Sequence, residues 1–523
     1  MSKPRIMYYN DGRHSHIYRY EPPMQKEEYI SMVDEVVGTS VEAIMLCLGE
    51  GRTMLHDTKA GELLGHNVDK WNHAIFRRAY QNAKHLIDEG NDPLRIICER
   101  AHEKGILLYP NLIMQRGRLD AAVRCSDFRF NNTHLEIDAR GDLGSSFPGY
   151  DGLDFKHQES RNERFAIIEE VLTEYDVDGF ELYLTQMPYF FHPKEIDSGR
   201  TIMTNWIGEI YELLKKTGKQ RELVVRVPLN IKESHGAGLD TEEWIKQGIV
   251  DVVVGEDSQQ EQMTDFTPLI KIAQNTETRI IAPLSNNVRS DRLGTATISV
   301  IRASASNYWQ QNVDGLYLAG WHGEWPYEST FYEKLRELPH PEIMSAKDKF
   351  YSVPTQAESK DLLYRSEETP RKLPCKLELN TPVSVDFTIS DDLHRWGNVD
   401  RVHEVIFRVR IVGHTELDQI NFKLNGVELP SSIHRRINEL YKQRSPHERI
   451  MGGYWHIFRL DTKHWPKRGG NTFTATLLYR DSDISEEDII CTLRDVEIET
   501  KYLLGKSFQR DIVDPDLGPS DNY

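Results

Sequence analysis

The chain has 523 residues, of which 39% are hydrophobic and 28% are charged. This much apolar material allows a sizeable core and excludes wholesale disorder, and the length predicts two or three domains. The 64 Lys and Arg residues against 82 Asp and Glu residues give a net charge of −18. Such an acidic chain is not expected to bind nucleic acid, because binding to phosphates needs a basic surface.

The sequence also argues against a membrane-spanning protein and against a disulfide-stabilised one. The sequence has no apolar run of about 18 residues, so no membrane partner is expected, and its start lacks the apolar segment of a signal peptide. The five cysteines form no CxxC pair, which argues against a disulfide framework and against a thiolate zinc site. These features predict a reducing, cytoplasmic location.

The first two thirds of the chain alternate short apolar segments with longer helical patterns. Helical spacing is seen over residues 71–87, 165–175 and 205–214. Eight strands, each followed by a helix, predict a (β/α)₈ TIM barrel over residues 1–350 that would be the catalytic domain. The eight predicted strands are residues 6–9, 43–48, 106–112, 179–184, 223–227, 250–254, 278–282 and 315–318.

The pattern changes after the barrel. Residues 351–374 are polar and contain several prolines, as is typical of a linker. Residues 375–510 show alternating strand patterns, and Asn425-Gly426 is a strong hairpin signal. We therefore expect a small antiparallel β-sandwich there, followed by an acidic tail over residues 511–523.

In a barrel of this kind the active site lies where the strands end, at their carboxyl termini. Side chains alternate along a strand, so Glu181 and Tyr183 are predicted to point into the barrel, while Phe180 and Leu182 pack under the helices. A carboxylate inside the barrel is costly unless it is paired or functional. Glu181 is therefore either a catalytic group or the structural partner of Arg226 on the next strand.

Further carboxylates follow two other strands. Glu256 and Asp257 come directly after the sixth predicted strand, and Glu324 follows the eighth. Paired with Glu181, one of them could reach the separation of about 5–5.5 Å of a retaining glycosidase or about 6.5–9.5 Å of an inverting one. A solvated loop is the alternative for the two residues after the sixth strand.

Several other side chains at strand ends are candidates for binding a sugar. Aromatic rings stack on the C–H faces of sugars, so Trp321 and the neighbouring His322 are candidates, although a Trp can equally be part of the core. Residues 10–14 form a polar cluster that could also be an ordinary turn. The remaining predicted substrate-binding residues are Tyr9, Asn10, Asp11, His14, Glu50, Asn111, Tyr183 and Arg226.

The positions of the histidines do not favour a metal site. His14 and His16 form an HxH pair of the kind seen after the first strand of metal-dependent hydrolases. Such enzymes have further His ligands after the fifth and sixth strands, where this chain has Asn230 and Glu256-Asp257. Dinucleotide and Walker loops are absent from the sequence, so neither a cofactor nor a metal is expected.

The segment that runs into the fourth strand, Glu169-Glu-Val-Leu-Thr-Glu-Tyr-Asp-Val-Asp-Gly-Phe-Glu-Leu182, together with Pro188, resembles glycoside-hydrolase-like TIM-barrel families, including the glycosyl-hydrolase-10-like proteins. A second similar segment covers residues 244–252. The resemblance extends from residue 5 to about residue 349, and the downstream part looks like the β-sandwich that often follows such barrels. It implies a hydrolase that acts on sugars.

The chain departs from that family at the fourth strand. Related proteins commonly have an Asp where this chain has Tyr183, and an Arg where it has Gln186. Glu181, two residues earlier on the same face, could replace the missing carboxylate. The departure is also what a barrel that binds sugar without hydrolysing it would show.

The sequence thus predicts a glycoside hydrolase of a poly- or oligosaccharide, with Glu181 and either Asp257 or Glu256 as the catalytic pair and Glu324 in reserve. The alternatives are a non-hydrolytic carbohydrate-binding protein, and a sugar lyase or metal-dependent hydrolase. Four arginines near the predicted mouth would favour a sulfated or uronic substrate unless they are solvated: Arg13, Arg52, Arg116 and Arg118. Self-association is left open.

Overall fold

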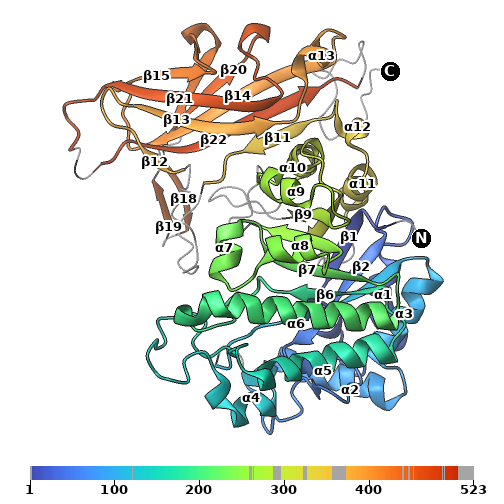
Figure 1. Ribbon diagram of the computed structural model, residues 1–523. Helices are drawn as coiled ribbons and strands as arrows, with labels where there is room; N and C mark the ends of the chain where they lie inside the picture. Colours follow the sequence, from blue (N-terminus) through green and yellow to red (C-terminus); the bar gives the residue numbers. More distant parts are fainter. Residues whose placement is uncertain are drawn as a thin grey trace.

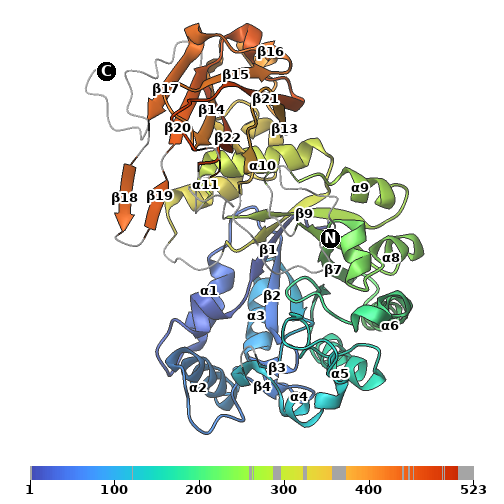
Figure 2. The ribbon, with the colours of Figure 1, turned by 90° about the vertical axis from the view of Figure 1, so that its left-hand side faces the viewer.

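The computed structural model describes residues 3–119, 122–257, 262, 264–286, 296–321, 327–355, 373–438, 441–445, 448–451, 453–485, 487 and 489–504. The chain forms a barrel with helices around it and, stacked on one side of the barrel, a set of antiparallel sheets (Figure 1). Figure 2 shows the barrel from the side at which its strands end.

The predicted TIM barrel is confirmed. Its strands are paired in parallel in the order β1-β10-β9-β8-β7-β6-β5-β2, and a further pairing of β1 with β2 closes the ring. All eight coincide with the predicted apolar segments, because strands buried on both faces are continuous apolar runs. They are β1 (Ile6–Asn10), β2 (Ala43–Glu50), β5 (Leu107–Ile113), β6 (Gly179–Tyr183), β7 (Glu222–Pro228), β8 (Val252–Glu256), β9 (Arg279–Ser285) and β10 (Gly315–Ala319).

Helices cover the outside of the ring. Side chains on the outer faces of the strands, such as Phe180 and Leu182, join the helices in one large apolar core. The helices of the barrel are α1 (Lys26–Asp34), α2 (Ala74–Asp88), α3 (Pro93–Glu103), α4 (Asp127–Asn131), α5 (Gln158–Glu174), α6 (Ile196–Thr217), α7 (Ile231–Gly236), α8 (Thr241–Gln247), α9 (Thr267–Ala273), α10 (Ile298–Gln310), α11 (Ser329–Glu337) and α12 (Pro341–Met344).

The chain also inserts short elements after β2 and β5, on the face where the strands end. The two short strands β3 (Thr53–Met54) and β4 (Glu62–Leu63) extend the sheet beyond β2. The 3-10 turn η2 (Ala122–Arg124) and α4 follow β5. These segments bring side chains to the mouth that the eight strands alone do not supply.

The predicted β-sandwich is confirmed as well. One sheet has the order β11-β22-β14-β20-β17, with β12 beside β22, and the second has the order β13-β21-β15-β16. Both residues of the predicted Asn425-Gly426 turn have positive φ angles, 52° and 81°, as a tight hairpin between β15 and β16 requires. The strands are β11 (Lys349–Ser352), β12 (Cys375–Lys376), β13 (Pro382–Ile389), β14 (Val402–Val412), β15 (Gln419–Leu424), β16 (Val427–Glu428), β17 (His434–Asn438), β20 (Gly453–Arg459), β21 (Gly469–Tyr479) and β22 (Thr492–Tyr502).

The sandwich rests on the barrel through α10. Ala303 of α10 belongs to the sandwich core, and Asn307 Nδ2 donates to the Thr388 carbonyl at 3.2 Å. A separate hairpin of β18 (Tyr441–Ser445) and β19 (Glu448–Met451) extends from the sandwich toward the barrel (Figures 1 and 2). A short helix, α13 (Leu393–Gly397), lies between β13 and β14. The expected tail over residues 511–523 and most of the expected linker, residues 356–372, lie outside the described residues.

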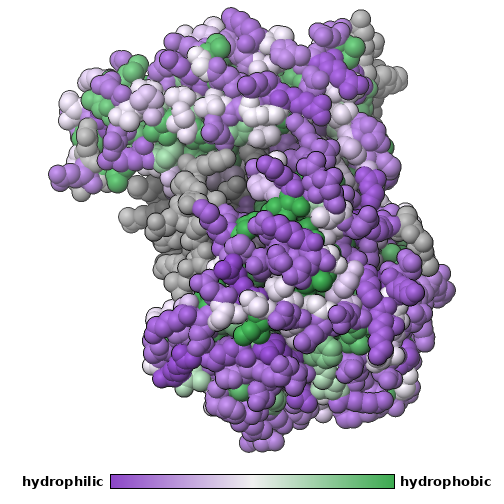
Figure 3. All heavy atoms as spheres, in the orientation of Figure 1, coloured by the Kyte–Doolittle hydropathy of each residue, from purple (hydrophilic) through white to green (hydrophobic). Residues whose placement is uncertain are grey.

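The face seen in Figure 3 is mostly hydrophilic, and its apolar side chains form small patches. Within the described ranges, no helix is both long and apolar enough to cross a bilayer. All five cysteines are described, and they form no disulfide.

Three histidines form a hydrogen-bonded row inside the sandwich. His414 Nδ1 lies 2.8 Å from the Thr415 carbonyl, His414 Nε2 lies 3.2 Å from His456 Nε2, and His456 Nδ1 lies 3.0 Å from His434 Nε2. Burial lowers the pKa of all three imidazoles, and that of His456 falls to about 2. The folded sandwich therefore holds this row neutral.

Acid should destabilise the sandwich through this row. The pKa of His456 is lower in the folded than in the unfolded chain, so its contribution is lost below the unfolded value of about 6.5, at about 1.4 kcal/mol per pH unit. In urea unfolding followed at pH 7 and pH 5, His456→Gln should lose about 2 kcal/mol less stability than the unmodified chain. An identical loss in both proteins would contradict a buried neutral His456.

Candidate functional site

A cavity of about 370 Å³ lies at the mouth of the barrel. Eight of the residues predicted from the sequence line it, and they come from five different strand ends, so the strand-end rule located the cavity. These eight residues are Tyr9, Asp11, His14, Glu50, Tyr183, Arg226, Glu256 and Asp257.

Arg226 forms the floor of the cavity. Its guanidinium lies 4.0 Å from the centre of the Tyr183 ring, 5.0 Å from that of Tyr317 and 5.5 Å from that of Tyr9. Burial alone would lower the pKa of Arg226, but its ion pair with Glu256 and the surrounding tyrosines raise it well above the usual value. The arginine therefore keeps its charge at the bottom of the cavity.

Glu256 ends β8 and contacts two groups of neighbouring strand ends. Arg226 forms an ion pair with one carboxylate oxygen, and the Thr185 hydroxyl donates to the other. Next to it, Asp257 accepts a hydrogen bond from the Thr264 hydroxyl at 3.0 Å. Glu256 is partly exposed to the cavity, so a bound ligand can reach this carboxylate.

Glu181 points into the barrel, as predicted, but it lies below the cavity and does not line it. Its exposed fraction is 0%, and both carboxylate oxygens accept from the Tyr317 hydroxyl, at 3.0 and 2.9 Å. Strand register explains the depth: Glu181 pairs with Val224, one inward layer below the level of Tyr183 and Arg226. Two residues along a strand correspond to about 7 Å.

Burial raises the pKa of Glu181 to about 7, although Arg226, Asn111 and Tyr317 act in the opposite direction. The predicted structural pair between Glu181 and Arg226 is replaced by an ion pair between Arg226 and Glu256. Arg226 influences Glu181 through its charge alone.

The polar cluster after β1 is a turn that also holds an acid. Gly12 has a φ of +65°, which lets the chain reverse so that Asp11 Oδ1 accepts from the backbone N–H groups of Arg13 and His14, at 2.9 and 3.1 Å. The His14 ring contacts the other oxygen of Asp11. Asn10 only caps the same turn, where its Oδ1 accepts from Gly12 N at 2.9 Å.

The two rings of the HxH pair face different carboxylates. His14 contacts Asp11, whereas His16 is buried and lies 3.5 Å from Glu35. The two rings therefore do not form one pair of metal ligands.

Glu50, at the end of β2, is surrounded by three arginines. Arg13 Nη1 lies 2.6 Å and Arg124 Nη1 lies 3.5 Å from Oε1, and Arg116 Nε lies 3.1 Å from Oε2. Burial alone would raise the pKa of Glu50, but the three arginines together hold it below its usual value. All three also line the cavity.

Other predicted residues lie elsewhere. Trp321 is buried in the core outside the ring, where its indole N–H donates to the Leu284 carbonyl at 2.7 Å. Asn111 is buried beside Glu181 in the layer below the cavity. His322 and Glu324 lie outside the described residues. Neither Trp321 nor Asn111 lines the cavity.

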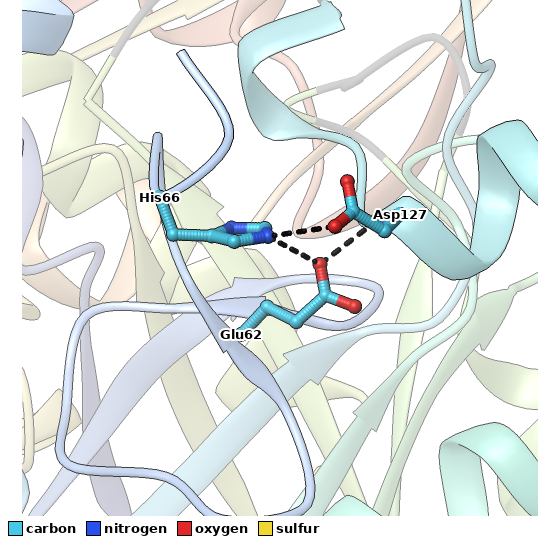
Figure 4. Close-up of side chains that lie close together, drawn as sticks. All are labelled: Glu62, His66 and Asp127. Carbon is cyan, nitrogen blue, oxygen red and sulfur yellow. Dashed lines mark hydrogen bonds and ion pairs between the residues drawn. The ribbon is translucent and has the colours of Figure 1, made fainter. Parts of the chain in front are cut away.

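One cluster outside the cavity lining has the composition of a metal site. Nε2 of His66 points at Glu62 and Asp127, at 3.1 and 3.3 Å (Figure 4). Its Nδ1 lies 3.0 Å from the Leu63 carbonyl, and Asn67 donates to Asp127 at 2.9 Å. The imidazole therefore contacts both carboxylates directly. The cluster joins the segment after β2 to α4.

Comparison with known proteins gives little beyond the fold. No family model matches the chain, and neither does any curated protein. The narrower resemblance to glycosyl-hydrolase-10-like proteins thus stays a prediction.

Several solved structures of glycoside hydrolases are distantly similar to the chain. One is alpha-L-fucosidase isoenzyme 2 from Paenibacillus thiaminolyticus, with 11% identity over 66% of this chain and 50% of that chain and a TM-score of 0.42. Another is an alpha-amylase from Geobacillus thermoleovorans, solved in complex with acarbose, with 11% identity over 92% of this chain and 99% of that chain and a TM-score of 0.42. Similarity at this level does not identify the residues of the site.

The position of Glu181 predicts an unusual pH dependence of stability. Because its folded pKa of about 7 lies above the unfolded value of about 4.5, the chain loses stability as the pH rises between these values. Glu181→Gln has no such ionisation. The free energy of unfolding of this variant, relative to that of the unmodified chain, should therefore rise by about 2.5 kcal/mol between pH 5 and pH 8 in urea titrations. A difference that stays constant with pH would show that Glu181 is not buried as described.

Proposed function

We propose that the chain is a glycoside hydrolase that cleaves an oligo- or polysaccharide in the mouth cavity. The observation that carries the proposal is the position of Glu256: a carboxylate in the lining of a barrel mouth, paired with Arg226 and oriented by the Thr185 hydroxyl. A carboxylate held in place in this way is what glycoside hydrolysis uses as nucleophile or as general base.

The cavity offers two carboxylates for the second role, that of the acid. Asp257 follows Glu256 directly, and Asp11 approaches from β1 and is contacted by His14. General acid–base help of this kind accelerates bond cleavage about 10²–10⁴-fold. Tyr9 and Tyr183 present aromatic surface in the same cavity, where a sugar ring could stack.

Glu181 takes a different part in this proposal from the one the sequence suggested. It is sealed below the floor, so it does not touch a ligand in the cavity. We assign Glu181 a positioning role. The charge of its carboxylate changes the electrostatic potential at Arg226, and Arg226 holds Glu256 in place.

The main alternative is a barrel that binds sugar without cleaving it. It is supported by Tyr183 and Gln186, which stand in the cavity lining where the resembling proteins have Asp and Arg. Hydrolysis and binding are separated by incubating the chain with a panel of polysaccharides, measuring released reducing ends and, in parallel, measuring binding by calorimetry. Saturable binding with no released ends on long incubation would favour the alternative.

Glu256→Gln provides the direct test on any substrate that the panel identifies. We expect turnover to fall by at least about 10²-fold, because the amide cannot act as nucleophile or base. Glu222→Gln is the matched control: this buried carboxylate lies at the opposite end of the barrel, bound to Arg279 and Tyr109 at 2.7 and 2.9 Å. The control should lose stability but keep its turnover per folded molecule. Full activity of Glu256→Gln would refute the assignment.

Asp257→Asn and Asp11→Asn then identify the acid. The variant that lacks the acid should cleave substrates with poor leaving groups at least about 10²-fold more slowly, yet be much less impaired on aryl glycosides, whose leaving groups need no protonation. If both variants keep full activity on both substrate types, neither residue is the acid.

A further inference from the structure

The wall of the cavity at the ends of β1, β2 and β5 carries three arginines. Three guanidinium groups surround the single carboxylate of Glu50, at 2.6, 3.1 and 3.5 Å. Their side chains are largely buried, with exposed fractions of 6% for Arg13, 15% for Arg116 and 19% for Arg124. Three guanidinium groups thus converge on one carboxylate in the lining of the cavity, in a chain whose net charge is −18.

Hydrogen-bond donors without a partner also indicate a ligand in this cavity. The Nε atoms of Arg13 and Arg124 are buried and have no hydrogen-bond partner among the described residues. On the cavity floor, Nε and Nη1 of Arg226 likewise have no hydrogen-bond partner among the described residues, while Nη2 of Arg226 donates to Glu256. Buried donors of charged groups usually find an acceptor, so their number here indicates a ligand that supplies acceptor oxygens.

Carboxylates lie on the opposite side of the mouth. In the closed ring of eight strands, β8 lies directly across from β2. The end of β8 brings Glu256 and Asp257 to the cavity, whereas the end of β2 brings Glu50 with its arginines. An anionic group therefore meets three guanidinium groups on one side and two carboxylates, one of them paired with Arg226, on the other, which would orient an elongated ligand across the cavity.

We propose that the wall of Arg13, Arg116 and Arg124 binds an anionic substituent of a glycan, either the carboxylate of a uronic acid or a sulfate ester. Planar guanidinium groups match the paired oxygens of both. The inference rests on the proposed function for the glycan and for the placement of its scissile bond at Glu256. The arginine wall itself is independent of hydrolysis.

Calorimetry with the Glu256→Gln protein tests the inference without turnover. The probes are a galacturonate trisaccharide, a sulfated galactose trisaccharide and neutral galactotriose, each at 50 and 300 mM NaCl. We expect at least one anionic probe to bind at least about tenfold more tightly than the neutral one, and the preference to shrink in high salt. Preference for the uronate identifies a carboxylate as the natural group, and preference for the sulfated probe identifies a sulfate. Equal or weaker binding of both anionic probes would overturn the inference.

Arginine variants in the same background locate the site. Arg116→Gln and Arg124→Gln should each weaken the anionic probe about tenfold and leave any binding of the neutral probe unchanged, and Arg124→Lys should restore part of the loss because it keeps the charge. Arg52→Gln is the control, because Arg52 faces Glu62 at 3.8 Å and does not line the cavity. Thermal unfolding confirms that each variant is folded. An anionic preference that survives in both Gln variants would contradict the site.

The two proposals can fail separately. Anionic binding that depends on the arginines, without any release of reducing ends by the unmodified chain, would remove the hydrolase and leave the binding site. Hydrolysis of neutral glycans alone, with no anionic preference, would do the reverse.

Discussion

The candidate site depends on a guanidinium that keeps its charge inside the barrel. Arg226 is buried among three tyrosine rings, and its ion pair with Glu256 compensates for the loss of water. A buried charge without such a partner would cost several kcal/mol, so the arginine and the carboxylate require each other. Their pairing places a carboxylate at the bottom of the cavity and separates the cavity from the sealed layer that contains Glu181.

The architecture could be predicted from the sequence because it depends on local patterns. Strands buried on both faces are short apolar runs, and all eight were recognisable, as was the Asn-Gly hairpin of the sandwich. Alternation along β6 correctly turned Glu181 toward the interior. Alternation gives the face of a residue and not its depth, which is why Glu181 was placed at the mouth although it lies one layer below it. Counting back from the end of the strand is the signal that would have shown this.

The arginine wall was only partly predictable. Arg13 and Arg116 follow strands and were recognised as residues near the mouth, whereas Arg52 and Arg118 face Glu62 and Glu136 instead. Arg124 lies in the insertion after β5 and meets Glu50 across 74 residues of sequence, with no local pattern that announces the contact. Insertions on the active face thus supply the part of the site that strand periodicity does not encode.

The central claim is that one cavity holds an anionic glycan between an arginine wall and the carboxylate of Glu256. The most direct measurement is a crystal structure of the Glu256→Gln protein with the anionic oligosaccharide that it binds most tightly. The account predicts a carboxylate or sulfate group in contact with Arg116 and Arg124, and a glycosidic oxygen beside residue 256. A ligand bound outside the mouth, or one whose anionic group faces β8, would contradict it.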